Sequence, residues 1–378
     1  MNQIEKLIAK LCPNGVAWVE LGQLIDYEQP TPYLVSSTEY DNSYPTPVLT
    51  AGQTFLLGYT KESEGIYQAS KDDPVIIFDD FTTATKWVDF NFKAKSSAMK
   101  MLKSHDTNRM NLRFFWFYLP SIIIDTSQHT RYWISKFTTE RIPLPPIEIQ
   151  NEIVKILDTF SELEAELEAE LKAREAQYKY YKNLLLSFGN LDATKVQWVP
   201  IFDVSVNLDS RRKPVTKDKR SAGNYPYYGA SGIVDFVEDY LFDGDYLLVS
   251  EDGANLLARS TPIAFSIGGK NWVNNHAHVL QFESYELRRL TECYLNSIDL
   301  SPYVAGGAQP KLSQSNLNRI LVPVPPTEEL LRVVQILDSF ESLIYNQNSG
   351  LLAEISARKK QYEYYRDKLL TFKELESA

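Results

Sequence analysis

Cysteine and long apolar runs are nearly absent from this sequence of 378 residues. It holds two cysteines, Cys12 and Cys293, which are too few for a disulfide framework and typical of a reducing compartment. No apolar run approaches the roughly 20 residues that a membrane helix needs. The first residues, "MNQIEKLIAKL", mix charges into their apolar positions and do not resemble a signal peptide. These absences predict a soluble cytoplasmic protein.

Catalytic motifs are also missing. No G-x-x-x-x-G-K-[ST] loop occurs, so the sequence does not predict ATP hydrolysis. The turns "LPPIE" and "VPPTE" lack the acidic or asparagine residue that a DNA amino-methyltransferase needs before Pro-Pro-aromatic. Two of the four histidines lie in "NNHAH", but no cysteine or third histidine is nearby, which favours a structural role over a metal site. The sequence therefore predicts no catalytic residue, no metal and no cofactor bound by this chain.

Net positive charge is lacking as well. The formal net charge is −10, which argues against simple electrostatic attraction to a nucleic-acid backbone. Much of the acid lies in "SELEAELEAELKAREAQ", residues 161–177. Two groups of cations stand out, and each taken singly is best interpreted as a solvated face. They are Arg211, Arg212, Lys213, Lys217, Lys219 and Arg220, and Lys93, Lys95, Lys100 and Lys103.

The sequence does contain an internal repeat, which determines how its other motifs are interpreted. The stretch "PPIEIQNEIVKILDTF" at 145–160 returns as "PPTEELLRVVQILDSF" at 325–340, and 325 − 145 = 180 positions separate them. The stretches "QYKYYKNLLLSF" (177–188) and "QYEYYRDKLLTF" (361–372) match at an offset of 184, so about one helical turn is added in the second copy. The chain is therefore a tandem repeat.

Single positions extend the match through the rest of each copy. Arg131 and Lys311 are 180 positions apart. Aligning "KAKSSAMKML" with "WVNNHAHVLQ" sets Ala98 on Ala277. Each copy thus combines a globular segment with a long helix.

The globular segments predict sheet. A chain of this length suits two domains or more, and runs such as "DPVIIFDDF" and "GDYLLVSEDG" predict short strands between turn residues. We predict an α+β fold: two mixed, β-rich globular domains separated by an antiparallel pair of long helices, with an internal pseudo-two-fold repeat. The predicted boundaries are 1–146 and 191–326 for the globular domains, and 147–190 and 327–378 for the helical regions.

The helical segments carry a narrow apolar seam. Its spacing of three and four residues is typical of a helix that packs on a partner helix. Asn346, Asn348 and Gly350 interrupt the second seam, which predicts a break near Gly350. We expect residues 2–11 to complete the pattern beside the C-terminal end. The alternative is that each helix only covers its own domain. The predicted packing residues are Ile156, Phe160, Leu163, Leu167, Leu171, Tyr178, Tyr181, Ile336, Phe340, Leu343, Leu351, Ile355, Tyr362 and Tyr365.

Turns of small residues recur where a recognition surface is expected. "PVLTAGQ" (47–53) and "PYYGASG" (226–232) would let backbone N–H groups and hydroxyls approach phosphates. Acidic residues could accept a hydrogen bond from cytosine N4, and asparagines could read adenine. The first copy offers as DNA-binding candidates Thr50, Gly52, Gln53, Lys61, Asp79, Asp80, Thr82, Lys86, Ser96, Ser97 and Arg131. The second copy offers Arg211, Arg212, Tyr228, Ser231, Glu251, Asp252, Asn255, Asn274, Asn275, His276 and Lys311.

A nuclease is the alternative interpretation. The acid pairs Asp79-Asp80 and Glu251-Asp252 each follow an apolar run and could hold Mg²⁺. No suitably placed lysine follows in both copies, which disfavours a self-contained, internally duplicated metal-dependent endonuclease. A third interpretation is a coiled-coil scaffold that binds only protein.

Together these motifs resemble the specificity subunit of type I restriction-modification systems. The resemblance covers the whole chain and rests on "PLPPIEIQNEIVKILD", "PVPPTEELLRVVQILD", the "QYxYY" helix ends, "YPYYGASG", "EDGAN" and "WVNNHAHVL". In that family two target-recognition domains alternate with two similar helical regions. One departure is that the glutamine of the first box, Gln150, is Leu330 in the second. This difference concerns only the local contacts of the helix entry.

The resemblance implies a non-catalytic subunit that recognises double-stranded DNA. Each recognition domain would read one half of a bipartite site, with a spacer of about six base pairs that sets the half-site centres close to one duplex turn apart. The chain would scaffold two copies of an adenine-N6 methyltransferase subunit and, through them, restriction subunits. S-adenosylmethionine would belong to the methyltransferase subunit and ATP with Mg²⁺ to the restriction subunit. Two identical partners match a pseudo-two-fold repeat.

Overall fold

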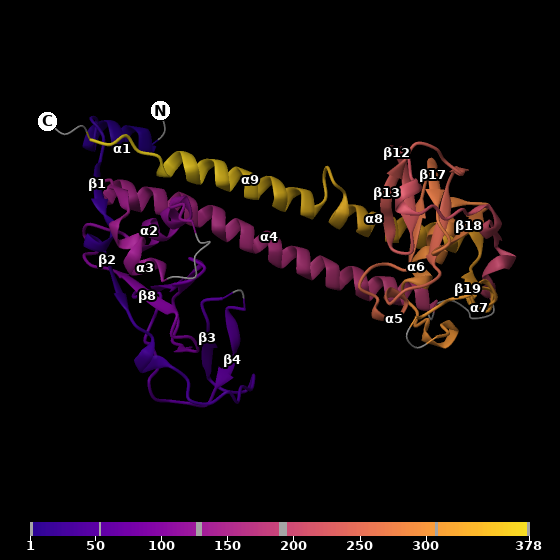
Figure 1. Ribbon diagram of the computed structural model, residues 1–378, viewed down its shortest axis with the longest axis horizontal. Coiled ribbons are helices and arrows are strands. Elements are labelled where there is room, and N and C mark those ends of the chain that lie inside the picture. The colour runs from indigo at the N-terminus through magenta and orange to yellow at the C-terminus, as the bar shows by residue number, and fades with distance from the viewer. Residues whose placement is uncertain (1–2, 53, 126–130, 189–194, 307–308, 376–378) are drawn as a thin grey trace. The chain divides into compact units, whose positions relative to one another are not determined.

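The computed structural model contains one α+β arrangement twice (Figure 1). It describes residues 3–52, 54–125, 131–188, 195–306 and 309–375. By its internal contacts the chain divides into two compact units: unit 1 is Met1–Leu167 with Ile355–Ala378, and unit 2 is Glu168–Glu354. Each unit holds one globular domain and segments of the long helices. Among the described residues, every helix is too short or too polar to span a membrane.

Unit 1 builds its globular domain on three small sheets. An antiparallel sheet has the order β2 (Ile25–Glu28), β8 (Met99–Ser104), β5 (Val75–Asp79) and β6 (Thr85–Val88). A second sheet has the order β4 (Leu56–Thr60), β3 (Thr46–Leu49) and β7 (Lys93–Ala94). Strand β1 (Ala17–Glu20) pairs with β9 (Arg141–Leu144). The central strand β5 is buried along its whole length, as its continuous apolar run predicts.

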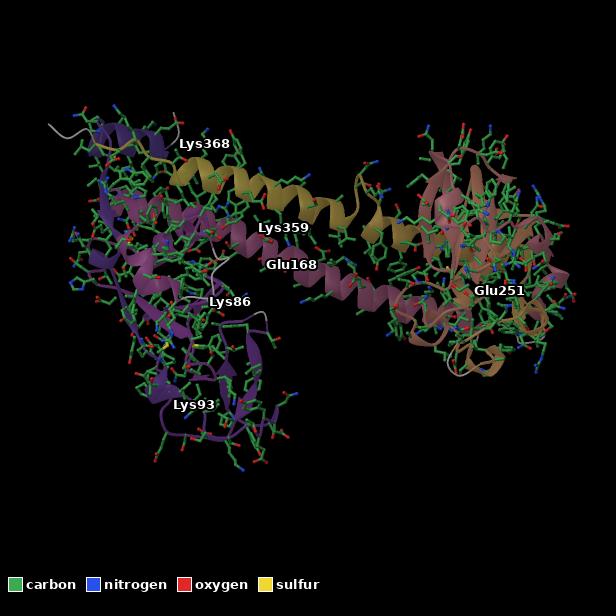
Figure 2. The ribbon with its side chains drawn as sticks, viewed as in Figure 1. Lys86, Lys93, Glu168, Glu251, Lys359 and Lys368 are labelled. Carbon is green, nitrogen blue, oxygen red and sulfur yellow. The ribbon has the colours of Figure 1, made fainter. Side chains whose placement is uncertain are left out.

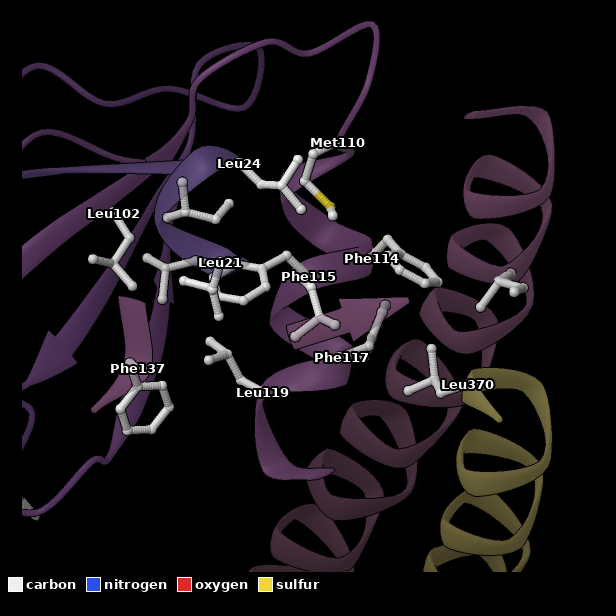
Figure 3. Packing of buried hydrophobic residues seen from close by; sticks show 14 of the residues in the cluster. Leu21, Leu24, Leu102, Met110, Phe114, Phe115, Phe117, Leu119, Phe137 and Leu370 are labelled. Atoms are coloured by element: carbon white, nitrogen blue, oxygen red, sulfur yellow. The ribbon is translucent and has the colours of Figure 1, made fainter. Parts of the chain in front are cut away.

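Short helices complete the core of unit 1. They are α1 (Gln3–Leu11), α2 (Leu112–Tyr118) and α3 (Tyr132–Ser135). The side chain of Asn111 caps α2 by accepting hydrogen bonds from the backbone N–H groups of Arg113 and Phe114. Phe114 and Phe117 of α2 then enter the same apolar cluster as Leu370, which comes from the C-terminal helix (Figure 3). The domain core therefore includes a residue from the far end of the chain.

Unit 2 repeats this topology, with one more strand in its second sheet. Its first sheet has the order β11 (Ser205–Asn207), β18 (Ala277–Phe282), β15 (Tyr246–Ser250) and β16 (Ala264–Ile267). The second has the order β13 (Gly232–Val237), β12 (Ala222–Gly229), β17 (Lys270–Val273) and β14 (Phe242–Asp243), and β10 (Gln197–Pro200) pairs with β19 (Leu321–Val324). Helices α5 (Asn255–Ala258), α6 (Tyr285–Leu295) and α7 (Gln314–Asn318) complete the domain. The predicted α+β repeat is confirmed.

The sheet registers refine the alignment of the two copies. Trp18 faces Pro143 across β1 and β9, and Trp198 faces Pro323 across β10 and β19, which keeps the offset of 180. In the central sheets, Asp80 N donates to the carbonyl of Ala98, whereas Glu251 N donates to the carbonyl of His276. Ala98 therefore corresponds to His276, and the predicted match with Ala277 is wrong by one position.

The long helices are α4 (Ile147–Ser187), α8 (Thr327–Tyr345) and α9 (Leu351–Leu370). The predicted break is confirmed, because α8 ends at Tyr345 and α9 begins directly after Gly350. The N–H groups of Asn348 and Ser349 both donate to the side chain of Asn346, which closes a turn in place of a helical continuation. A Cβ on Gly350 would lie 2.6 Å from the backbone nitrogen of Asn346, so this turn needs a glycine.

The helices pack antiparallel within each unit. In unit 1 the rings of Phe160 and Tyr365 stack at 5.7 Å, and one turn further along α4, Glu164 pairs with Lys359 at 3.2 Å. Residue numbers thus rise along one helix as they fall along the other. In unit 2 the ring of Tyr181 stacks on Phe340 at 5.7 Å, and Tyr345 donates a hydrogen bond of 3.3 Å to Glu175. The expected antiparallel packing is confirmed within both units.

The seam differs from the prediction at two leucines. Leu163 is 41% exposed and Leu343 is 48% exposed, so neither belongs to it. Seven residues make nearly two helical turns, so Glu164 shares the face of the buried Leu157 and Leu163 turns outward. Of the other predicted packing residues, Ile355 is buried, Tyr181 and Tyr365 stack as described, and half-buried ones are Ile156, Phe160, Leu167, Leu171, Tyr178, Ile336, Phe340, Leu351 and Tyr362.

The two ends of the described chain meet in unit 1. The N–H of Val16 donates to the carbonyl of Lys373 at 2.9 Å, and the N–H of Leu375 donates back to the carbonyl of Val16 at 2.9 Å. Arg141 pairs with Glu374 at 2.7 Å. Within residues 2–11, Ile4 of α1 lies in the same apolar cluster as Leu370 of α9. The expectation that these residues complete the repeat pattern stays a prediction.

Candidate nucleic-acid interface

A buried acid follows the central strand of unit 1. Asp80 comes directly after β5 and is fully buried, as is Lys100 of β8, whose Nζ lies 3.3 Å from Asp80 Oδ2. Asp80 Oδ1 accepts a hydrogen bond from the N–H of Trp133 at 2.8 Å, and its carbonyl accepts one from the N–H of Tyr132. One aspartate therefore fixes the end of β5, strand β8 and the start of α3.

Unit 2 has a buried acid at the equivalent place (Figure 2). Glu251 follows β15 and accepts a hydrogen bond of 2.6 Å from Arg212, while Lys311 Nζ lies 3.2 Å from its other oxygen. Its carbonyl accepts from the N–H of Leu312, as that of Asp80 does from Tyr132. Burial alone would raise the pKa of Glu251, but the hydrogen bond from Arg212 and the nearby cations hold that pKa below its ordinary value.

A histidine joins the same cluster. His278 Nδ1 lies 2.6 Å from Asp209 Oδ2, and Nε2 donates to the carbonyl of Leu312 at 2.8 Å. Ligand atoms of Asp209, Glu251 and His278 lie within 4.8 Å of one another, which is the spacing of a metal site. The guanidinium of Arg212 pairs with both carboxylates, at 2.6 Å from Glu251 and 3.3 Å from Asp209. The chain therefore supplies its own cation here.

Four of the predicted base-contacting residues are buried in the structure. Asp80 and Glu251 are engaged as described above. Asp79 is buried, and its Oδ1 accepts hydrogen bonds from the N–H groups that follow it. Asn274 is buried, and its Oδ1 accepts from the N–H of His276. Internal contacts hold the side chains of these four residues at the strand ends. Two of the acids that the nuclease interpretation needed, Asp80 and Glu251, are paired with cations.

The remaining candidates lie at or near the surface. Those exposed are Lys61, Thr82, Ser97, Arg131, Arg211, Ser231, Asn275, His276 and Lys311. Those half-buried are Thr50, Gly52, Lys86, Ser96, Arg212, Tyr228, Asp252 and Asn255. Gln53 lies outside the described residues.

Hydrogen bonds gather several of the unit 2 candidates at one edge of the domain. The N–H of Asn274 donates to the carbonyl of Tyr228 at 3.0 Å, and the hydroxyl of Ser250 donates to the carbonyl of Ala230. His276 donates to Asp252 at 2.9 Å. The turn after β12, the end of β15 and the loop before β18 therefore meet, and they carry polar side chains beside backbone groups. In unit 1, by contrast, Lys61 directly follows β4 and pairs with Glu39 at 3.4 Å.

Sequence reasoning missed an ion pair that ties each globular domain to a long helix. Arg113 of α2 pairs with Asp158 of α4 at 2.7 Å, and its guanidinium lies 4.4 Å from the centre of the Trp116 ring. Arg289 of α6 pairs with Asp338 of α8 at 2.8 Å. The sequence marks only the aspartates of these pairs, because both end the repeated "ILD". The two arginines are 176 and not 180 positions apart, and they lie in unlike local sequences.

We predict that losing the aspartate matters more in unit 1. Among the described residues, Arg113 pairs only with Asp158, whereas Arg289 also pairs with Glu292 and Glu341. Asp158→Asn should therefore destabilise α2 by about 1 kcal/mol, since the pair is partly exposed, and Asp338→Asn should destabilise α6 less. Hydrogen exchange of the amides in α2 and α6 measures both.

The matched control for this prediction is Glu166→Gln, because Glu166 is exposed on the same helix as Asp158. It should leave exchange in α2 unchanged. Equal loss of protection in α2 and α6 on losing the two aspartates would contradict the asymmetry.

A family model described as "Type I restriction modification DNA specificity domain" matches residues 13–174 and again 195–357. The chain is 37% identical over 406 residues to the Escherichia coli type I restriction enzyme EcoR124I/EcoR124II specificity subunit, with 100% of this chain and 99% of that protein covered. A putative type I specificity subunit of Haemophilus influenzae is 37% identical over 189 residues, which covers 49% of each chain.

Solved structures show the same fold. A type I restriction-modification S subunit from M. genitalium aligns with a TM-score of 0.62 and 17% identity, over 94% of this chain and 96% of that one. A chain from a study of "complex assembly" and "conformational transition" in a type I system aligns with a TM-score of 0.57 and 14% identity, over 95% and 98%. At these identities the likeness concerns the fold.

Proposed function

Because the chain belongs to the family of type I restriction-modification specificity subunits, we propose that it reads a bipartite site on double-stranded DNA, one half with each globular domain. The observation that carries the proposal is that one topology occurs twice, with different side chains at equivalent strand ends. Two copies of one scaffold with unlike surfaces suit two unlike sequences. The matched family description names DNA specificity and not a catalytic activity.

The proposed reading surface of unit 2 is the edge gathered around the β12 turn. Ser231, Asn275 and His276 are exposed there and offer the donors and acceptors that base edges recognise. Lys311 is exposed beside them and suits a phosphate. In unit 1 the equivalent Arg131 is exposed next to α3. We propose that these two cations position the backbone while the neighbouring side chains specify the sequence.

A pair of matching apolar patches supports two identical protein partners. As the patch of unit 1 we propose the exposed Leu163, Tyr364 and Tyr365, and as that of unit 2 the exposed Leu343, Tyr180 and Tyr181. Tyr364 is 61% exposed and Tyr180 is 64% exposed. In each patch the adjacent tyrosine rings meet edge to face at 5.3 Å. Exposed aromatic residues in the same arrangement twice suit one partner bound twice.

We propose that this partner is the adenine-N6 methyltransferase subunit, two copies of which bind each chain. Restriction subunits would join through the methyltransferase. S-adenosylmethionine would be held by the methyltransferase subunit and ATP with Mg²⁺ by the restriction subunit, in the cytoplasm where the DNA lies. The spacer between the half-sites is proposed to be about six base pairs, so that their centres are close to one duplex turn apart.

The test of the function is methylation with and without the partner. The purified chain alone should neither methylate nor cut DNA. Together with the methyltransferase subunit it should direct N6-methylation of one adenine on each strand of a bipartite site. Metal-dependent cleavage by the chain alone, abolished by Asp79→Asn and Asp80→Asn, would establish the nuclease instead. Protein association without any DNA sequence preference would establish a scaffold.

We predict that each patch holds one methyltransferase subunit. Tyr180→Ser should reduce the number bound per chain from two to one, as should Tyr364→Ser, and the double variant should bind none. Native mass spectrometry measures this number. Phe236→Ser is the control, because Phe236 is 50% exposed but lies on strand β13 of the globular domain. If the double variant still bound two subunits, the patches would not be the docking surface.

A further inference from the structure

A strongly basic loop joins β11 to β12 in unit 2. Residues 211–220, "RRKPVTKDKR", hold six cations and one acid in ten positions. The chain as a whole has a net charge of −10, so this is a local departure from its overall charge. The loop has no regular strand or long helix to hold it, and its conformation must come from side-chain contacts.

Those contacts fix the loop backbone at two places. Trp272 Nε1 donates to the carbonyl of Lys213 at 2.6 Å. The N–H of Val215 donates to the hydroxyl of the buried Tyr227 at 2.9 Å, and Arg220 Nε donates to the carbonyl of Val215 at 2.9 Å. The Arg220 guanidinium also lies 4.3 Å from the centre of the Tyr227 ring. The loop is therefore built onto the aromatic residues of the second sheet.

Five of the six cations of this loop divide into two kinds, and the sixth, Arg211, donates to the carbonyl of Leu241 at 2.9 Å. Arg212 and Arg220 pair with carboxylates of the domain and are half-buried. Lys213, Lys217 and Lys219 are exposed, and no carboxylate of the described residues forms an ion pair with any of them. Lys213 and Lys219 help to line a pocket of about 810 Å³, together with Trp272. The fixed backbone thus presents three exposed lysines without an ion pair to any carboxylate of the described residues.

Unit 1 has no equivalent among its described residues. The strand pair Tyr227 and Trp272 of unit 2 corresponds to Val48 and Lys93 of unit 1. Lys93 is buried (Figure 2), pairs with Glu62 at 2.8 Å and donates to the carbonyl of Glu64. The segment between β2 and β3, residues 29–45, contains acids but no lysine or arginine. The basic loop therefore distinguishes the two globular domains.

We infer that residues 211–220 form a phosphate-binding loop, through which the second recognition domain supplies a sequence-independent part of the DNA affinity that the first does not. This inference rests on the proposed function, since it takes duplex DNA as the ligand. Each lysine that neutralises a phosphate releases counterions, and adds about 0.9 to the slope of log K against log salt concentration. Three lysines account for a slope of roughly 2 to 3.

The experiment uses the chain assembled with its methyltransferase subunit. The binding constant is measured from low to high salt on two duplexes of equal length. The cognate duplex carries the sequence that the complex methylates, and the other has a scrambled sequence. Lys213→Gln, Lys217→Gln and Lys219→Gln are combined in one variant. This variant should lower the slope by about 2 to 3 on both duplexes and leave the ratio of the two affinities unchanged.

Two further variants separate the loop from general charge and from misfolding. Lys71→Gln, Lys95→Gln and Lys136→Gln remove three exposed lysines from unit 1 and should change the slope by less than about 1. A variant that combines Lys213→Arg, Lys217→Arg and Lys219→Arg should retain the slope of the unmodified chain, because it keeps the charge.

The outcomes also distinguish this inference from the proposed function. An unchanged slope in the loop variant, or weaker binding on the cognate duplex alone, would overturn the phosphate-binding loop while DNA recognition stands. If the slope of log K against log salt concentration fell by the same amount in the loop variant and in the unit 1 variant, the claimed asymmetry would be overturned. If the unmodified complex did not prefer the cognate duplex, the proposed function itself would fail.

Discussion

A buried carboxylate after the central strand constrains both candidate reading surfaces. The carbonyl of Asp80 accepts the N–H of Tyr132 at the start of α3, and that of Glu251 accepts the N–H of Leu312 shortly before α7. Each of the two side chains also meets a cation. An unpaired carboxylate in such a place would cost several kcal/mol, so the cation is part of the fold. The cation differs, being Lys100 in one unit and Arg212 in the other. The scaffold is thereby kept while its surroundings vary.

The helical segments depend on a second repeated interaction. Asp158 and Asp338 close the repeated "ILD" of their helices and pair with arginines of the globular domains. The helix entry differs more. In unit 1 the buried Gln150 donates to the carbonyls of Arg109 and Pro145, each at 2.8 Å. In unit 2 the equivalent Leu330 packs in an apolar cluster. Hydrogen bonds in one unit and apolar packing in the other thus hold the start of the long helix.

Sequence patterns predicted the large features because these follow from local periodicity. The repeat, the short strands, the antiparallel packing and the break at Gly350 all leave spacing signals. Burial of Asp80 did not, because its partner Lys100 lies 20 positions away in sequence and meets it only through the pairing of β5 with β8. Leu163 was misplaced because a seam of mixed three- and four-residue steps does not fix which leucine faces the partner helix.

The central claim is that each globular domain reads its own half-site. Exchange of residues 1–146 for those of another member of the family tests it most directly, with the replacement keeping an arginine opposite Asp158. Sequencing of the methylated positions in genomic DNA, from cells that express the exchanged chain with its methyltransferase, reports both half-sites at once. The account predicts that one half-site changes and the other stays the same. A change in both half-sites, or in neither, would contradict it.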